Sequence, residues 1–209
     1  MRDVTQALAA WLEDGGRQIG EIVIHPVGGG FALCHRDDVG REDLASTSRT
    51  EAARELANHD DAGKFRPLKT APNLRHGWRL TVPDLAELRR ALDYFYPAML
   101  GVWCSHRRGE LPPVPLRETL GRQSGMYRVT QKITDAAAQE MIGGFCRSEG
   151  GCLKHPLWEI SPGQPIATLP AEKLQSPAAR ESWPLLCPEA CNLLVAKARE
   201  VVKKSDRKE

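Results

Sequence analysis

The placement of cysteine constrains this chain more than any other feature of its sequence. Six cysteines occur among 209 residues, and five of them follow residue 84. Four of these five form two close pairs, Cys146 with Cys152 and Cys187 with Cys191. Two pairs that folding brings together supply four thiolates, the ligand set that zinc or an iron-sulfur cluster requires. The second part of the chain is therefore predicted to fold around a metal centre.

Spacing alone leaves the identity of that centre open between zinc and iron-sulfur. Structural zinc sites hold each ligand pair with two to four intervening residues, so the gap of three between Cys187 and Cys191 fits zinc. The gap of five between Cys146 and Cys152 fits zinc less well. A third interpretation treats the cysteines as unconnected buried residues. Disulfides are not expected in a reducing compartment.

The second pair also carries a prediction about local geometry. Pro188 fits the first position of a helix, so Cys187 would be the N-cap residue and Cys191 would project one turn later from the same face. Both sulfurs would then lie at the positive end of the helix, where backbone N–H groups favour thiolates. This helix is expected to continue to about Lys203.

Several other residues are candidates for the surroundings of the centre. Cys104 is a possible additional or substitute ligand, whereas Cys34 lies inside a predicted hairpin strand between Leu33 and His35 and is expected to be a buried packing residue. His155, three residues after the first pair, could contact the centre without ligating it, and Arg122 and Tyr127 could hydrogen-bond it. The alternative for the last two is a solvated helix end.

Apolar periodicity predicts an α+β fold in two units. Residues 1–83 are expected to form a small α/β domain with a hairpin-containing sheet, and residues 84–209 a mostly helical, cysteine-rich domain. In the first unit the predicted elements are a helix over 4–12, hairpin strands over 19–24 and 31–35, a helix over 52–57 opened by a Ser48–Glu51 capping box, and a strand over 78–82. In the second, helices are predicted from Pro83, over 116–121 and over 134–145.

A long loop over residues 60–78 separates the last helix and strand of the first unit. It is dense in glycine, proline and cations, and loops of this length often carry function. Arg66, Lys69, Arg75 and His76 could grip an anionic ligand. Their even spread among prolines is equally consistent with a loop that docks on the neighbouring domain.

Composition excludes several classes of function. A formal net charge of +2 argues against broad affinity for nucleic acid, and no run of about 18 apolar residues could span a bilayer. The first 14 residues lack the uninterrupted apolar stretch of a secretory signal, so a cytoplasmic protein is expected. No histidine pair has the spacing of a metalloprotease zinc site, and most histidines are expected to be structural or on the surface.

Five segments of the sequence together resemble the extra regions attached to class II sirohydrochlorin cobaltochelatase-like proteins. They are Asp60–Trp78, Gly109–Pro112, Arg122–Tyr127, Gly151–Trp158 and Cys187–Leu194. In that family a chelatase domain is joined to a small α/β stabilising domain and to a helical domain that binds a [4Fe-4S] cluster. The order of the units in this chain matches the last two, and nothing in the sequence corresponds to the His-Gly loop of the chelatase domain.

The resemblance implies a [4Fe-4S] cluster in preference to zinc, ligated by Cys146, Cys152, Cys187 and Cys191. It also implies an accessory to metal insertion into tetrapyrroles in the sirohydrochlorin and cobalamin series, with a chelatase or an electron-transfer protein as partner. The cluster would be structural or redox-active, and no catalytic residue is assigned. The alternatives are a zinc-stapled module that binds protein or nucleic acid and, less favoured by the cysteine spacing, a dithiol redox enzyme.

Overall fold

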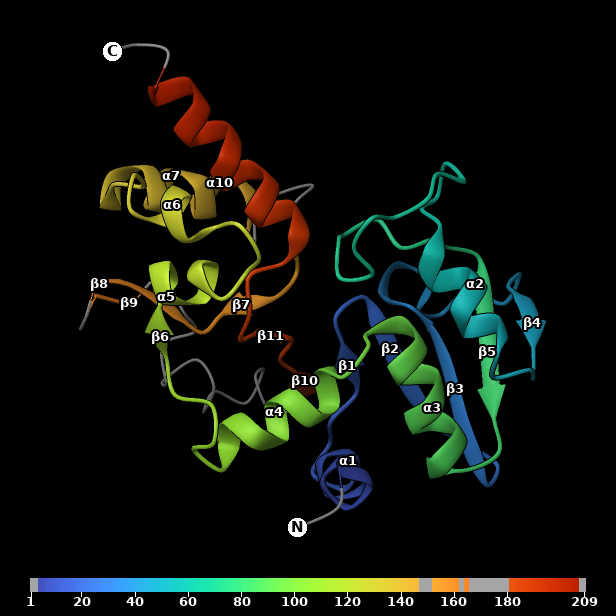
Figure 1. Ribbon diagram of the computed structural model, residues 1–209. Helices are drawn as coiled ribbons and strands as arrows, with labels where there is room; N and C mark the ends of the chain where they lie inside the picture. The colour runs from blue at the N-terminus through green and yellow to red at the C-terminus, as the bar shows by residue number, and fades with distance from the viewer. Residues whose placement is uncertain (1–3, 147–151, 162–163, 166–180, 207–209) are drawn as a thin grey trace.

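The computed structural model describes residues 4–146, 152–161, 164–165 and 181–206. Two groups of elements lie side by side in the fold (Figure 1). One is a six-stranded mixed sheet with its covering helices, and the other is a set of helices with two small sheets. The described residues therefore form an α+β fold, as the sequence predicts.

The first unit is built on a sheet of order β10-β1-β2-β3-β5-β4. Its strands are β1 (Gln18–Ile19), β2 (Ile22–Val27), β3 (Gly30–His35), β4 (Ala45–Thr47), β5 (Trp78–Val82) and β10 (Ser182–Trp183). Its helices are α1 (Val4–Glu13), α2 (Ala52–Asn58), α3 (Leu85–Phe95) and α4 (Met99–Arg107), with a short 3₁₀ turn at Arg36–Asp38. The four middle strands, β1, β2, β3 and β5, are antiparallel to one another, whereas β10 pairs with β1 and β4 pairs with β5 in parallel at the two edges.

The predicted hairpin is confirmed. Strands β2 and β3 pair from Ile22 with His35 to Val27 with Gly30, which leaves Gly28 and Gly29 as a two-residue turn. Gly29 has a φ of 95°, a conformation that glycine adopts without steric cost. Because a strand rather than a helix follows the glycines, this segment is a turn and not a phosphate-binding loop.

The predicted capping box of α2 does not form. The residue before α2 is Glu51, which is already in right-handed helical conformation and makes no side-chain cap. The carbonyls of Arg49 and Thr50 instead accept the N–H groups of Ala52 and Ala53, at 3.0 and 3.1 Å. Backbone carbonyls of a tight turn thus accept the N–H groups at the start of α2, which the sequence pattern assigns to the side chain of Ser48.

Alternating burial places one face of the sheet against the helices. Ile22 and Ile24 of β2 are fully buried, and the residues between and after them are more exposed. Helix α3 begins after Asp84, whose carboxylate accepts the N–H of Glu87 at 2.9 Å, and it buries Leu88 in the same core. This part of the chain thus has a core of its own.

That core extends beyond residue 83, where the sequence analysis divides the chain. Buried residues of α3 and α4, among them Phe95 and Cys104, belong to the same hydrophobic cluster as the sheet. Trp183 and Leu185 join it from the far end of the chain, because β10 pairs with β1. The apolar side of α3 packs on the sheet of the first unit, which precedes it in the sequence.

The second unit is mostly helical, as predicted. Its helices are α5 (Leu116–Gly121), α6 (Tyr127–Thr130), α7 (Asp135–Phe145) and α10 (Asn192–Ser205). Its strands are β6 (Val114–Pro115), β8 (Trp158–Ser161) and β9 (Gln164–Pro165) in one sheet, and β7 (His155–Pro156) with β11 (Leu186–Cys187) in another. Thr134 caps α7 by accepting the N–H of Ala137 at 3.2 Å. Within the described residues, no helix is long and apolar enough to cross a membrane.

Candidate metal centre

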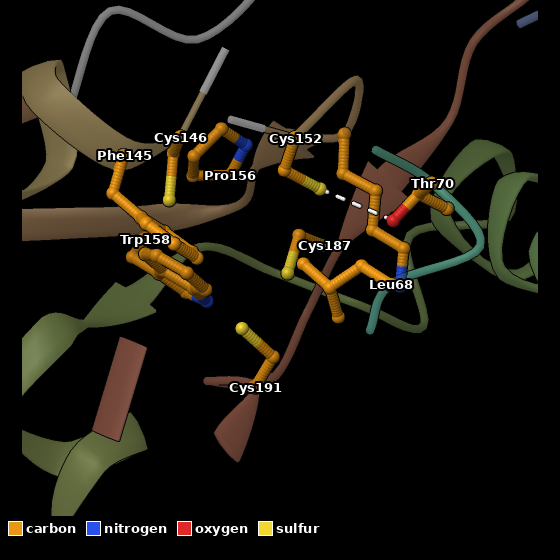
Figure 2. Close-up of a pocket in the computed structure, with 10 residues that line it drawn as sticks. Leu68, Thr70, Phe145, Cys146, Cys152, Pro156, Trp158, Cys187 and Cys191 are labelled. Carbon is orange, nitrogen blue, oxygen red and sulfur yellow. Dashed lines mark hydrogen bonds between the residues drawn. The ribbon is translucent and has the colours of Figure 1, made fainter. Parts of the chain in front are cut away.

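Four cysteines, in two pairs that are far apart in the sequence, line one pocket. They arrive from the end of α7, from the chain before β7, from the end of β11 and from the start of α10. Figure 2 shows their side chains around a common space. The described lining consists of Leu68, Thr70, Phe145, Cys146, Cys152, Lys154, Pro156, Trp158, Cys187 and Cys191.

The first pair is held by a short backbone pairing. The N–H of Cys146 donates to the carbonyl of Ile142 at 2.7 Å, which ends α7 at this residue. Cys146 and Cys152 then form an isolated parallel bridge. Residues 147–151, which connect them, lie outside the described residues.

The local geometry predicted for the second pair is wrong in one respect. Cys187 does not cap a helix, because it ends β11 and pairs with Pro156 of β7. Cys191 is the N-cap of α10, and its sulfur accepts the N–H of Leu194 at 3.4 Å. Only one of the two sulfurs therefore lies at the positive end of the helix. The strand pairing with β7, which joins residues about 30 positions apart, overrides the local preference of Pro188 for a helix start.

Burial makes the apo site unfavourable for thiolates. Desolvation, with smaller repulsions from the other three cysteines, raises the pKa of Cys146 to about 12. Desolvation also raises the pKa of Cys187 to about 12, against the opposing charge of Lys154. A coordinated metal reverses this balance, since metal-bound thiols are deprotonated.

One wall of the pocket comes from the first unit. Thr70, in the long loop between α2 and β5, places its hydroxyl 3.2 Å from the sulfur of Cys152 (Figure 2). Its carbonyl accepts the N–H of Leu153 at 2.7 Å, and Leu68 lines the same pocket. The loop is thus docked on the neighbouring unit, one of the two interpretations that the sequence allowed.

Arg66, one of the four cations of this loop, anchors it in the first unit. Arg66 is buried, lies 3.5 Å from the Glu21 carboxylate and donates to the carbonyls of Lys69 and Ala71. Glu21 in turn accepts the N–H groups of Asn73 and Leu74. Burial alone would raise the pKa of Glu21. Hydrogen bonds from His35 and Leu74 and the charge of Arg66 outweigh burial and hold the pKa below its ordinary value, so the carboxylate stays ionised.

The chemistry of the lining fits a bound iron-sulfur cluster. Four soft sulfur donors meet in a pocket whose other walls are largely apolar. Trp158 lines it with an indole nitrogen that is buried and has no hydrogen-bond partner among the described residues. Buried N–H groups are nearly always paired, so an acceptor inside the pocket would complete the site.

The remaining sequence candidates lie outside this lining. Cys104 and Cys34 are both buried, Cys104 in the core of the first unit and Cys34 on β3. Arg122 forms ion pairs with Glu118 at 2.7 Å and Glu189 at 2.9 Å.

His155 donates its backbone N–H to the carbonyl of Leu185 at 2.7 Å, and its side chain is not part of the lining. Tyr127 begins α6, but its side chain lies outside the described part of the structure. Sequence reasoning missed Thr70 and Trp158, although both fall in the segments that carry the family resemblance.

A second group of possible metal ligands lies in the first unit. Ligand atoms of His35, Asp37 and His76 lie within 4.8 Å of one another. Nδ1 of His35 accepts the N–H of Asp37 at 3.1 Å, Nε2 faces Glu21 at 3.5 Å, and the ring stacks on His76. Because both ring nitrogens face partners in the fold, we interpret this group as structural.

Two family models match consecutive parts of this chain. Residues 4–107 match the DR2241 stabilising domain, and residues 108–200 match the 4Fe-4S iron-sulfur cluster binding domain. The chain belongs to the family defined by these two domains. It is therefore an iron-sulfur-binding protein, and the zinc alternative has no support. Among curated proteins, none matches this chain.

A solved structure supports the same assignment. The crystal structure of DR2241 from Deinococcus radiodurans is similar to this chain, with a TM-score of 0.75 and 33% identity over 96% of the chain. That protein is described as multi-domain, with structural similarity to chelatases and two additional novel domains. This chain spans 41% of its length.

Proposed function

We propose that Cys146, Cys152, Cys187 and Cys191 ligate one [4Fe-4S] cluster. The observation that carries this assignment is the convergence of four cysteine side chains, from four separate places in the fold, on one pocket. Such clusters are held by four cysteine thiolates. When bound, the cluster supplies a redox-capable inorganic core that joins the ligating segments.

The cluster has a structural role in this proposal. Its ligands lie on the end of α7, beside β7, on β11 and at the start of α10, and the cluster would add covalent links between segments that already pack in one hydrophobic core. Because the free energy of ligation is gained only in the folded arrangement, it becomes free energy of folding. Thr70 and Leu68 extend the same stabilisation to the loop of the first unit.

The protein acts as an accessory to metal insertion into a sirohydrochlorin-type tetrapyrrole. Support for this comes from the family resemblance and from DR2241, whose description combines chelatase similarity with two further domains. The partner of this chain is accordingly a class II sirohydrochlorin chelatase. No residue of the described chain is assigned to the insertion reaction itself.

The metal content of protein purified without oxygen tests the cluster. We expect a coloured protein with four iron and four sulfide per chain, following the composition of the cluster. Colourless protein with one zinc per chain would contradict the proposal. Removal of iron by a chelator should lower the melting temperature of the second unit, which distinguishes a structural cluster from one that serves redox chemistry alone.

A separate experiment tests the partner. Cobalt or iron insertion into sirohydrochlorin by a class II chelatase is measured with and without this protein, in holo and apo form. We expect the holo form to bind the chelatase and to change the insertion rate or the thermal inactivation of the enzyme. Neither binding nor any effect would refute the accessory role while leaving the cluster assignment intact.

A further inference from the structure

We infer that the indole N–H of Trp158 donates a hydrogen bond to a sulfur of the bound cluster, either a sulfide or a ligating thiolate, and so favours its reduced state. This inference rests on the proposed cluster site. It assigns a positioning and tuning role to a residue that is not a ligand.

The first step is the burial of a donor without an acceptor. Trp158 is 1% exposed, and its Nε1 has no hydrogen-bond partner among the described residues. Leaving such a group unsatisfied costs about 1–3 kcal/mol, so native structures rarely do so. A tryptophan at this position is explained if the acceptor arrives with the cofactor.

The second step is the orientation of the ring. Trp158 is the first residue of β8, where pairing with Val114 of β6 fixes its backbone. Its ring lines the pocket, and Figure 2 shows the nitrogen-bearing end directed toward the side where Cys187 and Cys191 lie. The donor is therefore aimed into the cysteine site and not at the apolar core behind it.

The third step is the nature of the acceptor. Among the side chains of the described lining residues, only the cysteine sulfurs and the hydroxyl of Thr70 can accept a hydrogen bond. Thr70 is already placed against Cys152. Sulfur, as a ligating thiolate or as cluster sulfide, is thus the acceptor that this pocket offers to the indole.

The consequence is electrostatic. Reduction adds one negative charge to a cluster that is already anionic with four thiolates. A hydrogen bond becomes stronger as its acceptor becomes more negative, so N–H···S bonds stabilise the reduced state and raise the reduction potential. The low solvent exposure of Trp158 leaves little water to replace the lost bond.

Substitution of two tryptophans in the full chain tests the inference. Trp158→Phe removes the N–H and keeps an aromatic ring, and we expect a fall of about tenfold in the equilibrium constant for one-electron reduction, equal to about 59 mV. Trp183→Phe is the matched control. Trp183 is also buried with an Nε1 that lacks a partner among the described residues, but it packs on Trp11 in the core of the first unit.

Redox titration followed by electron paramagnetic resonance reads the result. A lower potential in Trp158→Phe, with Trp183→Phe at the wild-type value, supports the inference. Equal potentials in all three proteins, or equal shifts in both variants, overturn it. Wild-type protein without iron and sulfide would instead refute the proposed cluster, so the two failures are distinguishable.

A measurement on unsubstituted protein covers the case in which Trp158→Phe does not fold. With ¹⁵N-labelled tryptophan, the indole N–H of Trp158 should show a hyperfine shift or strong broadening in the holo protein that is absent from the apo protein. The Trp183 signal should change little. An indole N–H of Trp158 that is the same in both forms would overturn the inference.

Discussion

The hydroxyl of Thr70 lies 3.2 Å from the sulfur of Cys152, although the two residues are 82 positions apart in the sequence. A backbone hydrogen bond from Leu153 to the carbonyl of Thr70 fixes the same contact. The first unit therefore does more than pack beside the cysteine site, because it supplies part of the wall. Substitutions in that unit should be felt by the cluster.

Thr70→Val should weaken the retention of the cluster without abolishing its assembly. The valine keeps the shape of the side chain but removes a hydrogen bond to a charged sulfur, worth about 1.5 kcal/mol. We expect release of iron to a chelator to be about tenfold faster, followed by visible absorbance. The control is Thr119→Val, which removes a buried hydroxyl that has no partner among the described residues and does not line the pocket.

Cys191→Ser should separate ligation from helix capping. Serine is a good N-cap residue, so α10 should keep its helical signal in circular dichroism while the four-iron cluster is lost. Cys191→Ala should lose the cluster and also about 1 kcal/mol of stability from the cap. Cys104→Ser should retain full iron and sulfide, and a loss of both in that variant would contradict the ligand assignment.

Glu21→Gln should destabilise the first unit and release the loop that carries Thr70. The substitution leaves Arg66 as a buried cation without its partner, which costs about 3–5 kcal/mol in chemical unfolding. Glu42→Gln, at an exposed position, is the control and should change stability little. Equal stability of the two variants would show that the ion pair does not anchor the loop.

The same carboxylate predicts how stability depends on pH. The pKa of Glu21 in the folded protein lies below its ordinary value of 4.5. The stabilisation that it provides is therefore complete above about pH 4.5 and is lost as the pH falls through the lower, folded-state pKa. Denaturant titrations across this range should show a steeper loss for the wild type than for Glu21→Gln.

Lys154→Met should lower the reduction potential of the cluster. Lys154 lines the pocket, and its positive charge acts on Cys187, so it stabilises the added electron. Partial exposure to solvent should keep this effect smaller than that of Trp158→Phe. Lys64→Met removes an exposed lysine outside the pocket and should leave the potential unchanged.

Local patterns were sufficient to predict much of the fold. The range predicted for β5 is exact, and α1, α7 and the hairpin appear where periodicity and turn residues place them. The predictions of helix starts are wrong where contacts outside the local sequence determine the backbone conformation. The start of α2 is set by backbone carbonyls, and the helix predicted from Cys187 begins only at Asn192 because β11 pairs with a distant strand.

The residues of the candidate site also fall into those that the sequence predicts and those that it does not. Close spacing in the sequence identifies the four cysteines that share the pocket, because each pair is already local. Thr70 and Trp158 carry no such signal, since a threonine in a loop and a tryptophan in an apolar run are common in any fold. Thr70 reaches the sulfurs because the first unit docks on the second, and Trp158 does so through packing within the second unit. Both relations are visible only in three dimensions.

Strand β10 has a consequence for the modularity of this protein. Residues 182–183 complete the sheet of the first unit, and Cys187 follows only four residues after that strand ends. A cut after residue 107 would therefore strip the sheet of an edge strand and remove Trp183 and Leu185 from its core. The two family matches meet between residues 107 and 108, but β10 belongs to the second match and pairs with β1 of the first. Neither half should therefore fold completely when it is expressed alone.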